Sequence, residues 1–185
     1  VVLTGDHSWG KNEEQCAPDF DFIDALPGRK ILLRGNHDMF WEVNKTGRLN
    51  EKYKGRFYFL QNNYYVYDGI ALVGTKGYCY EGLDTPEHCE KILKRESERL
   101  RCSFEMAQKD GYNRYIVFLH YPPTTIGEDE STFTRMAEEY GAEQVIYSHS
   151  HGAARFHDSL QGDVNGITYR LVSSDFLDFD PIRLL

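Results

Sequence analysis

The sequence has little positive charge and no long apolar run. Lys and Arg number 21 against 29 Asp and Glu, which gives a formal net charge of -8. Because nucleic acid and anionic lipid both attract a positive field, this balance predicts no nucleic-acid partner. No apolar run approaches the roughly 20 residues that cross a bilayer, and no signal-type segment opens the chain. We therefore expect no membrane partner either.

Cysteine is also scarce. The four cysteines have neither the paired spacing of a thiolate metal site nor the density of a secreted disulfide scaffold. We expect reduced structural thiols, which favours the cytoplasm. A chain of 185 residues that is 41% hydrophobic can bury roughly 70% of the surface that it exposes when unfolded. No repeat or linker interrupts it, so we predict a single domain over residues 1–185.

Short apolar runs alternate with helical patterns, and this alternation predicts an α/β fold. Asn62-Asn63 and Asp68-Gly69 are typical of hairpin turns, so part of the sheet structure should be antiparallel. The predicted strands cover residues 1–5, 29–34, 56–60, 63–67, 70–74, 114–119, 144–148 and 167–173.

The clearest helical pattern runs from Thr85-Pro86 to Gly111. Thr85 suits the N-cap, and Pro86 suits the first helical position. Shorter helices are predicted over 12–25 and 131–140. The inward stripe expected for the long helix is Cys89, Leu93, Leu100, Phe104 and Ala107.

Polar clusters follow directly after four predicted strands, where α/β proteins usually bind their ligands. The clusters supply carboxylate, amide and imidazole groups, a mixture that suits Mn, Fe, Zn, Co or Ni better than Ca or Mg. We therefore predict a metal site. Its candidate ligands are Asp6, Asn36, His120, His149 and His151.

In their order, these clusters resemble the motifs of the calcineurin-like metallophosphoesterases. The resemblance is greatest to a bacterial subgroup with Gly-Asp-x-Ser-Trp, Arg-Gly-Asn-His-Asp, Leu-His-Tyr-Pro-Pro and His-x-His-Gly motifs. It implies a four-layer α-β-β-α sandwich of mixed sheets. It also implies a hydrolase that attacks a phosphomonoester or phosphodiester with a hydroxide bound by two divalent or trivalent metal ions. The implied partner is a small phosphorylated substrate.

The resemblance also implies a role for each residue. Asp6 would bridge the two ions, and His151 would bind the ion of the second site. His37 would face the substrate and protonate, or hydrogen-bond to, the leaving oxygen, while Asp38 would orient the His37 ring. The remaining ligands of the first ion would be Asn36, His120 and His149.

Three departures from the family pattern stand out. The Asp-x-His motif that normally precedes Gly5-Asp6 is absent, so we expect the first βα unit to be missing and one metal site to be incomplete. Ser148 stands where the family usually has glycine. His7 stands where the subgroup tends to have an apolar residue, and it either supports the site or does nothing there.

Other interpretations remain open. His149 and His151 alone could be alternating residues at a strand end, His120 a core histidine, and His37 a loop histidine bonded to backbone. A non-catalytic interaction module on the same fold is the alternative function, although such relatives tend to lose His37 or the His-x-His motif. A zinc hydrolase of the metallo-β-lactamase type also uses His-x-His, but it needs a following Asp-His, and Gly152-Ala153 follow here. Oligomeric state is left open.

Overall fold

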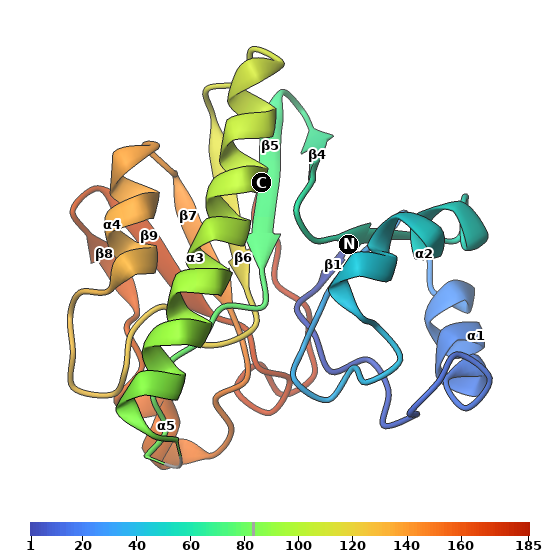
Figure 1. The fold of residues 1–185 in the computed structure, drawn as a ribbon, viewed down its shortest axis with the longest axis horizontal. Coiled ribbons are helices and arrows are strands. Elements are labelled where there is room, and N and C mark those ends of the chain that lie inside the picture. Colours follow the sequence, from blue (N-terminus) through green and yellow to red (C-terminus); the bar gives the residue numbers. More distant parts are fainter. Residues whose placement is uncertain (83) are drawn as a thin grey trace.

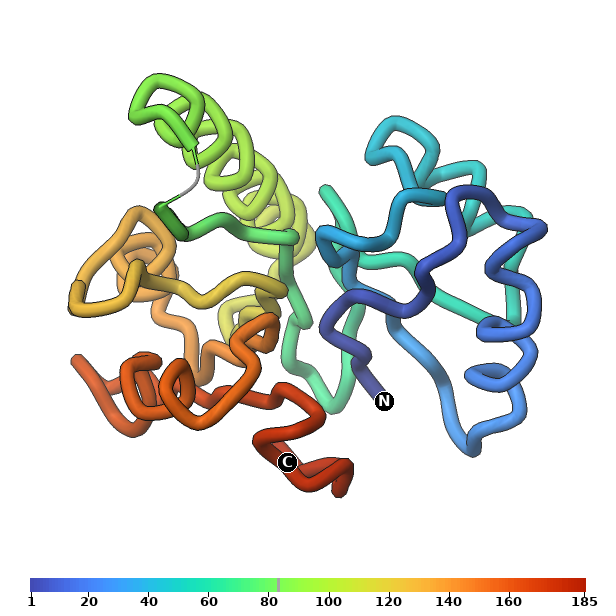
Figure 2. Tube along the Cα trace, turned by 90° about the horizontal axis from the view of Figure 1, so that it is seen from below, coloured from blue at the N-terminus to red at the C-terminus, as the bar shows by residue number. Residues whose placement is uncertain are grey.

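The computed structural model describes residues 1–82 and 84–185, which form four layers (Figure 1). Two β-sheets pack face to face, and helices cover the outer face of each sheet. The predicted α-β-β-α arrangement of an α/β chain is therefore confirmed. Figure 2 shows the two halves side by side, with the first residues running along the junction between them.

The smaller sheet is entirely parallel, with the order β1-β2-β3. The larger sheet is mixed, with the order β4-β5-β6-β7-β9-β8, and its two antiparallel pairs lie at its two edges. The strands are β1 (Val2–Leu3), β2 (Lys30–Leu33), β3 (Phe57–Leu60), β4 (Tyr64–Tyr67), β5 (Ile70–Thr75), β6 (Tyr115–Leu119), β7 (Gln144–Tyr147), β8 (Gly162–Val164) and β9 (Ile167–Leu171).

The helices divide between the two sheets. Residues of α1 (Ala17–Ala25) and α2 (Thr46–Lys52) pack on the smaller sheet, preceded at α2 by a 3-10 turn (Val43–Lys45). Residues of α3 (Pro86–Lys109) and α4 (Thr132–Glu139) pack on the larger sheet. A short helix, α5 (Ala153–His157), follows the last of the predicted metal-ligand clusters.

Alternation along the central strands builds the core between the sheets. In β2, Ile31 and Leu33 face the other sheet, whereas Leu32 faces the helices. In β6, Ile116 and Phe118 likewise face the junction. Both strands read as continuous apolar runs because both of their faces are buried. The two sheets are thereby held together, and the ends of their strands lie close to one another.

One of the two predicted hairpins is present. Asp68 and Gly69 have φ values of 50° and 76° and connect the antiparallel strands β4 and β5. The hairpin predicted at Asn62-Asn63 is wrong, because β3 and β4 belong to different sheets. Asn62 does adopt a positive φ of 56°, so the chain turns here, but it crosses from one sheet to the other. The turn residues indicated a change of direction and could not indicate the strand's partner.

The long helix α3 begins as predicted, with the Thr85 side chain accepting a hydrogen bond from the His88 backbone. Its inward face also holds a carboxylate that the apolar stripe did not predict. Glu96 is fully buried, accepts a hydrogen bond from Thr75 at 2.8 Å and pairs with Arg99. The buried carboxylate thus has three polar partners, since Arg95 Nε also lies 3.5 Å from it, as burial of a carboxylate requires.

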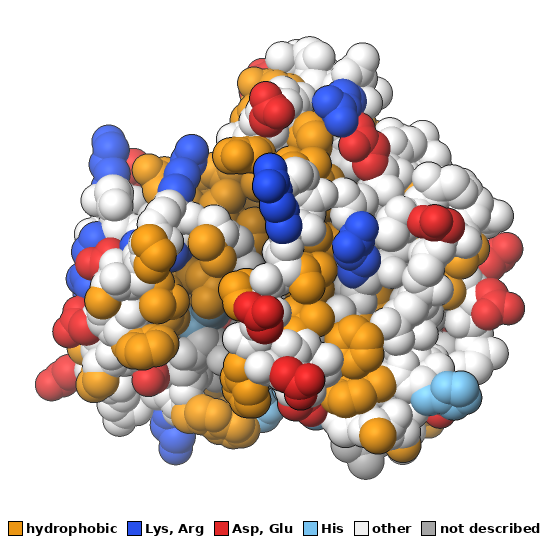
Figure 3. All heavy atoms as spheres, turned by 180° about the vertical axis from the view of Figure 1, so that it is seen from behind, with side chains coloured by type: hydrophobic (Ala, Val, Ile, Leu, Met, Phe, Trp, Pro, Cys, Tyr) orange, Lys and Arg blue, Asp and Glu red, His pale blue; other side chains and the backbone are white. Residues whose placement is uncertain are grey.

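Within residues 1–82 and 84–185, no helix combines the length and the apolar character needed to cross a membrane. Lys and Arg side chains are scattered over the face seen in Figure 3 rather than gathered in one patch.

Candidate metal centre

The candidate ligands lie at the carboxyl ends of strands from both sheets. His120 directly follows β6, and His149 comes two residues after the end of β7. From the smaller sheet, Asp6 and Asn36 each come three residues after a strand, β1 and β2 respectively. Because the strands concerned are parallel within each sheet, their carboxyl ends share an edge. Figure 2 views the molecule from below Figure 1, the side toward which the β5 arrow points.

Four side chains converge on one point. Asp6, His120 and His149 each offer a ligand atom, and these atoms lie within 4.8 Å of one another. Asn36 Oδ1 lies 2.7 Å from His120 Nε2 and 3.1 Å from His149 Nδ1. The two histidine nitrogens themselves are 3.1 Å apart. A carboxylate, an amide oxygen and two imidazole nitrogens that face each other form a donor set that fits a divalent cation of the first transition row.

The hydrogen bonds on the far sides of the two rings fix which nitrogen is free. His120 Nδ1 lies 2.9 Å from the carbonyl oxygen of Thr4, which only accepts, so Nδ1 carries the proton. His149 Nε2 lies 3.2 Å from a carboxylate oxygen of Glu81, so Nε2 carries the proton there. Burial lowers the pKa of His120, and burial also lowers that of His149 despite the nearby Glu81 charge. Both rings are therefore neutral near pH 7 and turn a lone pair toward the cluster, the form that binds metal.

The backbone is strained at two of the ligands. Asp6 and His149 have φ values of 58° and 66°, in the left-handed region that side chains other than glycine rarely adopt. Gly35 allows the close approach, because a Cβ there would lie 2.1 Å from Asp6 Oδ1. Strain of this kind persists where the surroundings over-determine the conformation, and it concentrates at functional sites.

Asp38 ties the two N-terminal ligand loops together. Its carboxylate is fully buried and accepts hydrogen bonds from the backbone N–H groups of Asp6, His7 and Gly35 at 2.7 to 2.9 Å. Its fourth contact, at 3.0 Å, is with His7 Nδ1. Sequence reasoning assigned Asp38 to the ring of His37, but the contacts found for it go to His7 and to backbone instead.

His7 is therefore more than an odd residue in the motif. Its side chain is 1% exposed and pairs with Asp38. Burial alone lowers the pKa of His7, but the charge of Asp38 outweighs this effect and raises it. Burial likewise opposes ionisation of Asp38, and the His7 charge and ring contact reverse this effect and bring the Asp38 pKa to about 2. His7 and Asp38 therefore form a buried hydrogen-bonded pair in which each charged form favours the other, and Asp38 also bonds the Asp6 N–H.

His37 lies at the edge of the cluster. Its backbone N–H donates to Asp6 Oδ1 at 2.9 Å, and its ring packs on the indole of Trp9 with ring centroids 4.2 Å apart. Trp9 is 79% exposed, so the pair faces solvent. This position suits a group that meets a substrate arriving from solution.

His151 is not part of the cluster. Its exposed ring lies 2.8 Å from Asp175 Oδ1, and the other oxygen of Asp175 accepts the Gly152 N–H at 3.1 Å. Within residues 1–82 and 84–185, His151 belongs to no group of three or more His, Cys, Asp or Glu side chains that could hold an ion, so its role at a second ion stays a prediction. Ser148, the departure from glycine, donates to the Thr4 carbonyl at 3.0 Å and joins β7 to the end of β1.

Two residues near the site carried no sequence signal. Glu81 contacts His149 and also pairs with Arg155 of α5. Glu81 lies in the loop between β5 and α3, and neither residue belongs to a motif. Only the distance between their atoms in space identifies them.

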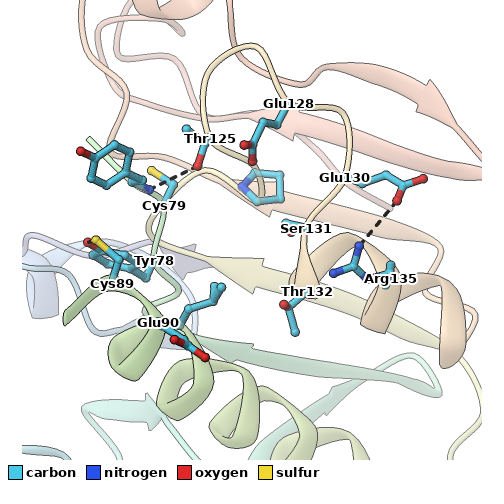
Figure 4. A pocket seen from close by; sticks show the side chains of 13 residues that line it. Tyr78, Cys79, Cys89, Glu90, Thr125, Glu128, Glu130, Ser131, Thr132 and Arg135 are labelled. Carbon is cyan, nitrogen blue, oxygen red and sulfur yellow. Dashed lines mark hydrogen bonds and ion pairs between the residues drawn. The ribbon is translucent and has the colours of Figure 1, made fainter. Parts of the chain in front are cut away.

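A cavity of about 260 Å³ lies beside this loop (Figure 4). It is lined by residues of the loop before α3, the start of α3 and the segment from Pro123 to Arg135, where Arg135 pairs with Glu130 at 3.5 Å. None of the seven candidate site residues lines it. The cavity therefore lies next to the candidate metal ligands and does not enclose them.

Comparisons with known proteins bear on this site. A family model described as calcineurin-like phosphoesterase matches residues 1–153, which include the whole cluster. None of the curated proteins matches the chain. Among solved structures, a protein of unknown function from Aquifex aeolicus is similar, with 18% sequence identity and a TM-score of 0.44 over 98% of this chain and 70% of that one.

Proposed function

Because the chain belongs to the calcineurin-like phosphoesterases, we propose that it hydrolyses a small phosphomonoester or phosphodiester in a metal-dependent reaction. The observation that carries the proposal is the convergence of one carboxylate, one amide oxygen and two neutral imidazoles on a common point. Such a set binds Mn, Fe, Zn, Co or Ni. The residues that would hold the ion are Asp6, Asn36, His120 and His149.

The bound ion would supply a Lewis acid for the phosphoryl oxygens and an activated water. The chain's own residues position these groups. The Thr4 carbonyl and Glu81 hold the two imidazoles in the tautomers that leave Nε2 of His120 and Nδ1 of His149 free. Asp38 fixes the backbone on either side of Asp6, so the carboxylate is pre-positioned before any ion arrives.

His37 would act on the leaving group. Its ring is partly exposed against Trp9, and its backbone is tied to Asp6. A ring in this position can donate a proton or a hydrogen bond to the leaving oxygen of a substrate held at the cluster. His151 and a second ion complete the proposal, as the family pattern implies.

A hydrolysis panel tests the proposal. Aryl phosphomonoesters and diesters are offered with added Mn²⁺ to the wild-type chain and to Asn36→Ala, His37→Ala and the exposed control His157→Ala. We expect hydrolysis by the wild type and by the control, and large losses for the other two. If the wild type held Mn²⁺ at both sites and hydrolysed none of the panel, the proposed function would be wrong.

A further inference from the structure

We propose that Glu81, anchored by Arg155, is a positioning residue for His149, and that it fixes the ring tautomer which presents Nδ1 to the metal. The inference rests on the proposed metal site and adds a residue that lies outside every motif in the sequence. Glu81 belongs to the loop between β5 and α3, 68 residues before its histidine partner.

The contact is sheltered from water. Glu81 Oε1 lies 3.2 Å from His149 Nε2, and the two side chains are 24% and 12% exposed. An ionised carboxylate can only accept a hydrogen bond, so Nε2 must carry the ring's proton. In a partly buried setting, a charge-assisted hydrogen bond is stronger than the same bond in water.

The consequence appears on the other side of the ring. With the proton on Nε2, Nδ1 of His149 has a free lone pair that faces the other ligands. Asn36 Oδ1 and His120 Nε2 each lie 3.1 Å from this Nδ1 atom. A carboxylate behind a metal-binding imidazole also increases the basicity of the ring, which strengthens its bond to the metal. Glu81 thus acts on the metal through His149.

Arg155 holds Glu81 in place. Its guanidinium pairs with the same Oε1 atom that faces His149. Arg155 lies six residues after His149, on α5, so the ligand and the anchor of its partner belong to one segment. Glu81 therefore contacts two residues of the same segment, His149 and Arg155. This clamp holds the ring of a residue whose backbone is strained, with a φ of 66°.

His120 shows the same design with a different partner. Its Nδ1 is fixed by the Thr4 carbonyl, a group that a side-chain substitution cannot remove. Glu81 is a side chain and can be replaced, so it offers the direct test of this kind of support.

The test compares Glu81→Ala, Glu81→Gln and Arg155→Met with the wild type and with Glu90→Gln. Glu90 is exposed at the start of α3 and contacts none of the four ligands, so it is a matched control. Mn²⁺ affinity is measured by calorimetry, and the tautomer of His149 is measured by nitrogen-15 NMR on metal-free protein. A thermal unfolding curve for each variant shows that it is folded.

We expect Glu81→Ala to weaken Mn²⁺ binding about 10- to 100-fold. In this variant the proton of the His149 ring should no longer be confined to Nε2. Glu81→Gln should lose less, because its amide oxygen still accepts the Nε2 proton. Arg155→Met should fall between the wild type and Glu81→Ala, and Glu90→Gln should match the wild type.

Two results would overturn the inference: Mn²⁺ affinity in folded Glu81→Ala within twofold of the wild type, or a wild-type His149 protonated on Nδ1. Its failure is separable from that of the proposed function. If the wild type hydrolyses the esters but Glu81→Ala binds Mn²⁺ as tightly as the wild type, only the inference about Glu81 is wrong. If Glu81→Ala weakens Mn²⁺ binding but the wild type hydrolyses no ester, the inference is supported and the proposed function is wrong.

Discussion

The molecule has an N-terminal half, residues 1–60 with the smaller sheet, and a C-terminal half, the described residues from 64 to 185 with the larger sheet. The two halves support their metal ligands in different ways. In the N-terminal half, Asp38 is fully buried and bonds three backbone N–H groups. In the C-terminal half, His149 is supported by Glu81 and Arg155, whose side chains are 24% and 43% exposed. The buried carboxylate holds loop backbone, whereas the more exposed one holds a single ring. Loss of the first should therefore damage the fold, and loss of the second should damage mainly the affinity for metal.

Asp38→Ala should have the largest effect. Four donors lose their acceptor, and each buried donor without a partner costs about 1–3 kcal/mol. We expect a loss of unfolding free energy of about 5 kcal/mol, which is enough to unfold a marginally stable domain. Urea denaturation measures it, with the exposed Asp21→Asn as the control. A loss below about 1 kcal/mol would break the comparison, because the N-terminal support would then be no stronger than a surface contact.

Much of this contrast could not be foreseen from the sequence. The motifs predicted Asp6, Asn36, His120 and His149, and the structure brings all four together because each follows a parallel strand. The supporting residues are different, since Glu81 is a single charged residue in a loop and Arg155 a single charged residue in a short helix. No period or spacing marks a charged side chain whose partner is 68 residues away. Such pairs become visible only when the sheets pack.

The same limit applies to the fold. Central strands such as β6 were predictable because both faces are apolar, and α3 because its N-cap and stripe are strong. The edge strand β8 (Gly162–Val164) was missed, since it is short and mostly exposed. The helix α2 (Thr46–Lys52) was missed as well, because Leu49 is its only buried hydrophobic residue. Elements that bury little carry little pattern.

Asp6→Ala and His151→Ala sharpen the comparison at the ligands themselves. Asp6 supplies the only carboxylate of the cluster within the described residues, whereas the ring of His151 pairs with Asp175. We expect Asp6→Ala to weaken Mn²⁺ binding more than about 100-fold, or about 2.7 kcal/mol. His151→Ala should leave this ion in place. Calorimetry with a metal-content assay measures both, and equal losses would contradict the assignment.

The His7–Asp38 pair predicts a pH dependence of stability in the metal-free protein. The Asp38 pKa is lowered from 3.8 to about 2, so its contribution is present above about pH 4 and is lost as pH falls toward 2. The His7 pKa is raised above 6.5, so its contribution is full below pH 6.5 and is lost as pH rises through the folded value. The pair therefore stabilises most between about pH 4 and 6.5, by on the order of 2 kcal/mol on the acid side.

Urea denaturation across this range in a chelator measures the effect. His7→Gln should remove the loss on the alkaline side, whereas the exposed His88→Gln should keep it. An unchanged alkaline slope in His7→Gln would show that the ion pair contributes nothing there.

The smallest effect should come from Trp9, an exposed residue that supports His37 in the N-terminal half. Its ring packs on His37 with centroids 4.2 Å apart, a contact worth about 0.5–1.5 kcal/mol. Trp9→Ala should therefore lower kcat/KM for an aryl phosphate by about 2- to 10-fold, because the His37 ring is no longer held, and should lower the unfolding free energy by no more than about 1.5 kcal/mol. Trp9→Phe should keep most of the activity, and Phe22→Ala, which removes another exposed aromatic residue, should keep all of it. If Trp9→Ala lowered the unfolding free energy without lowering kcat/KM, Trp9 would support the fold and not the reaction. The comparison, in which buried residues support the fold and exposed residues support the reaction, would then fail.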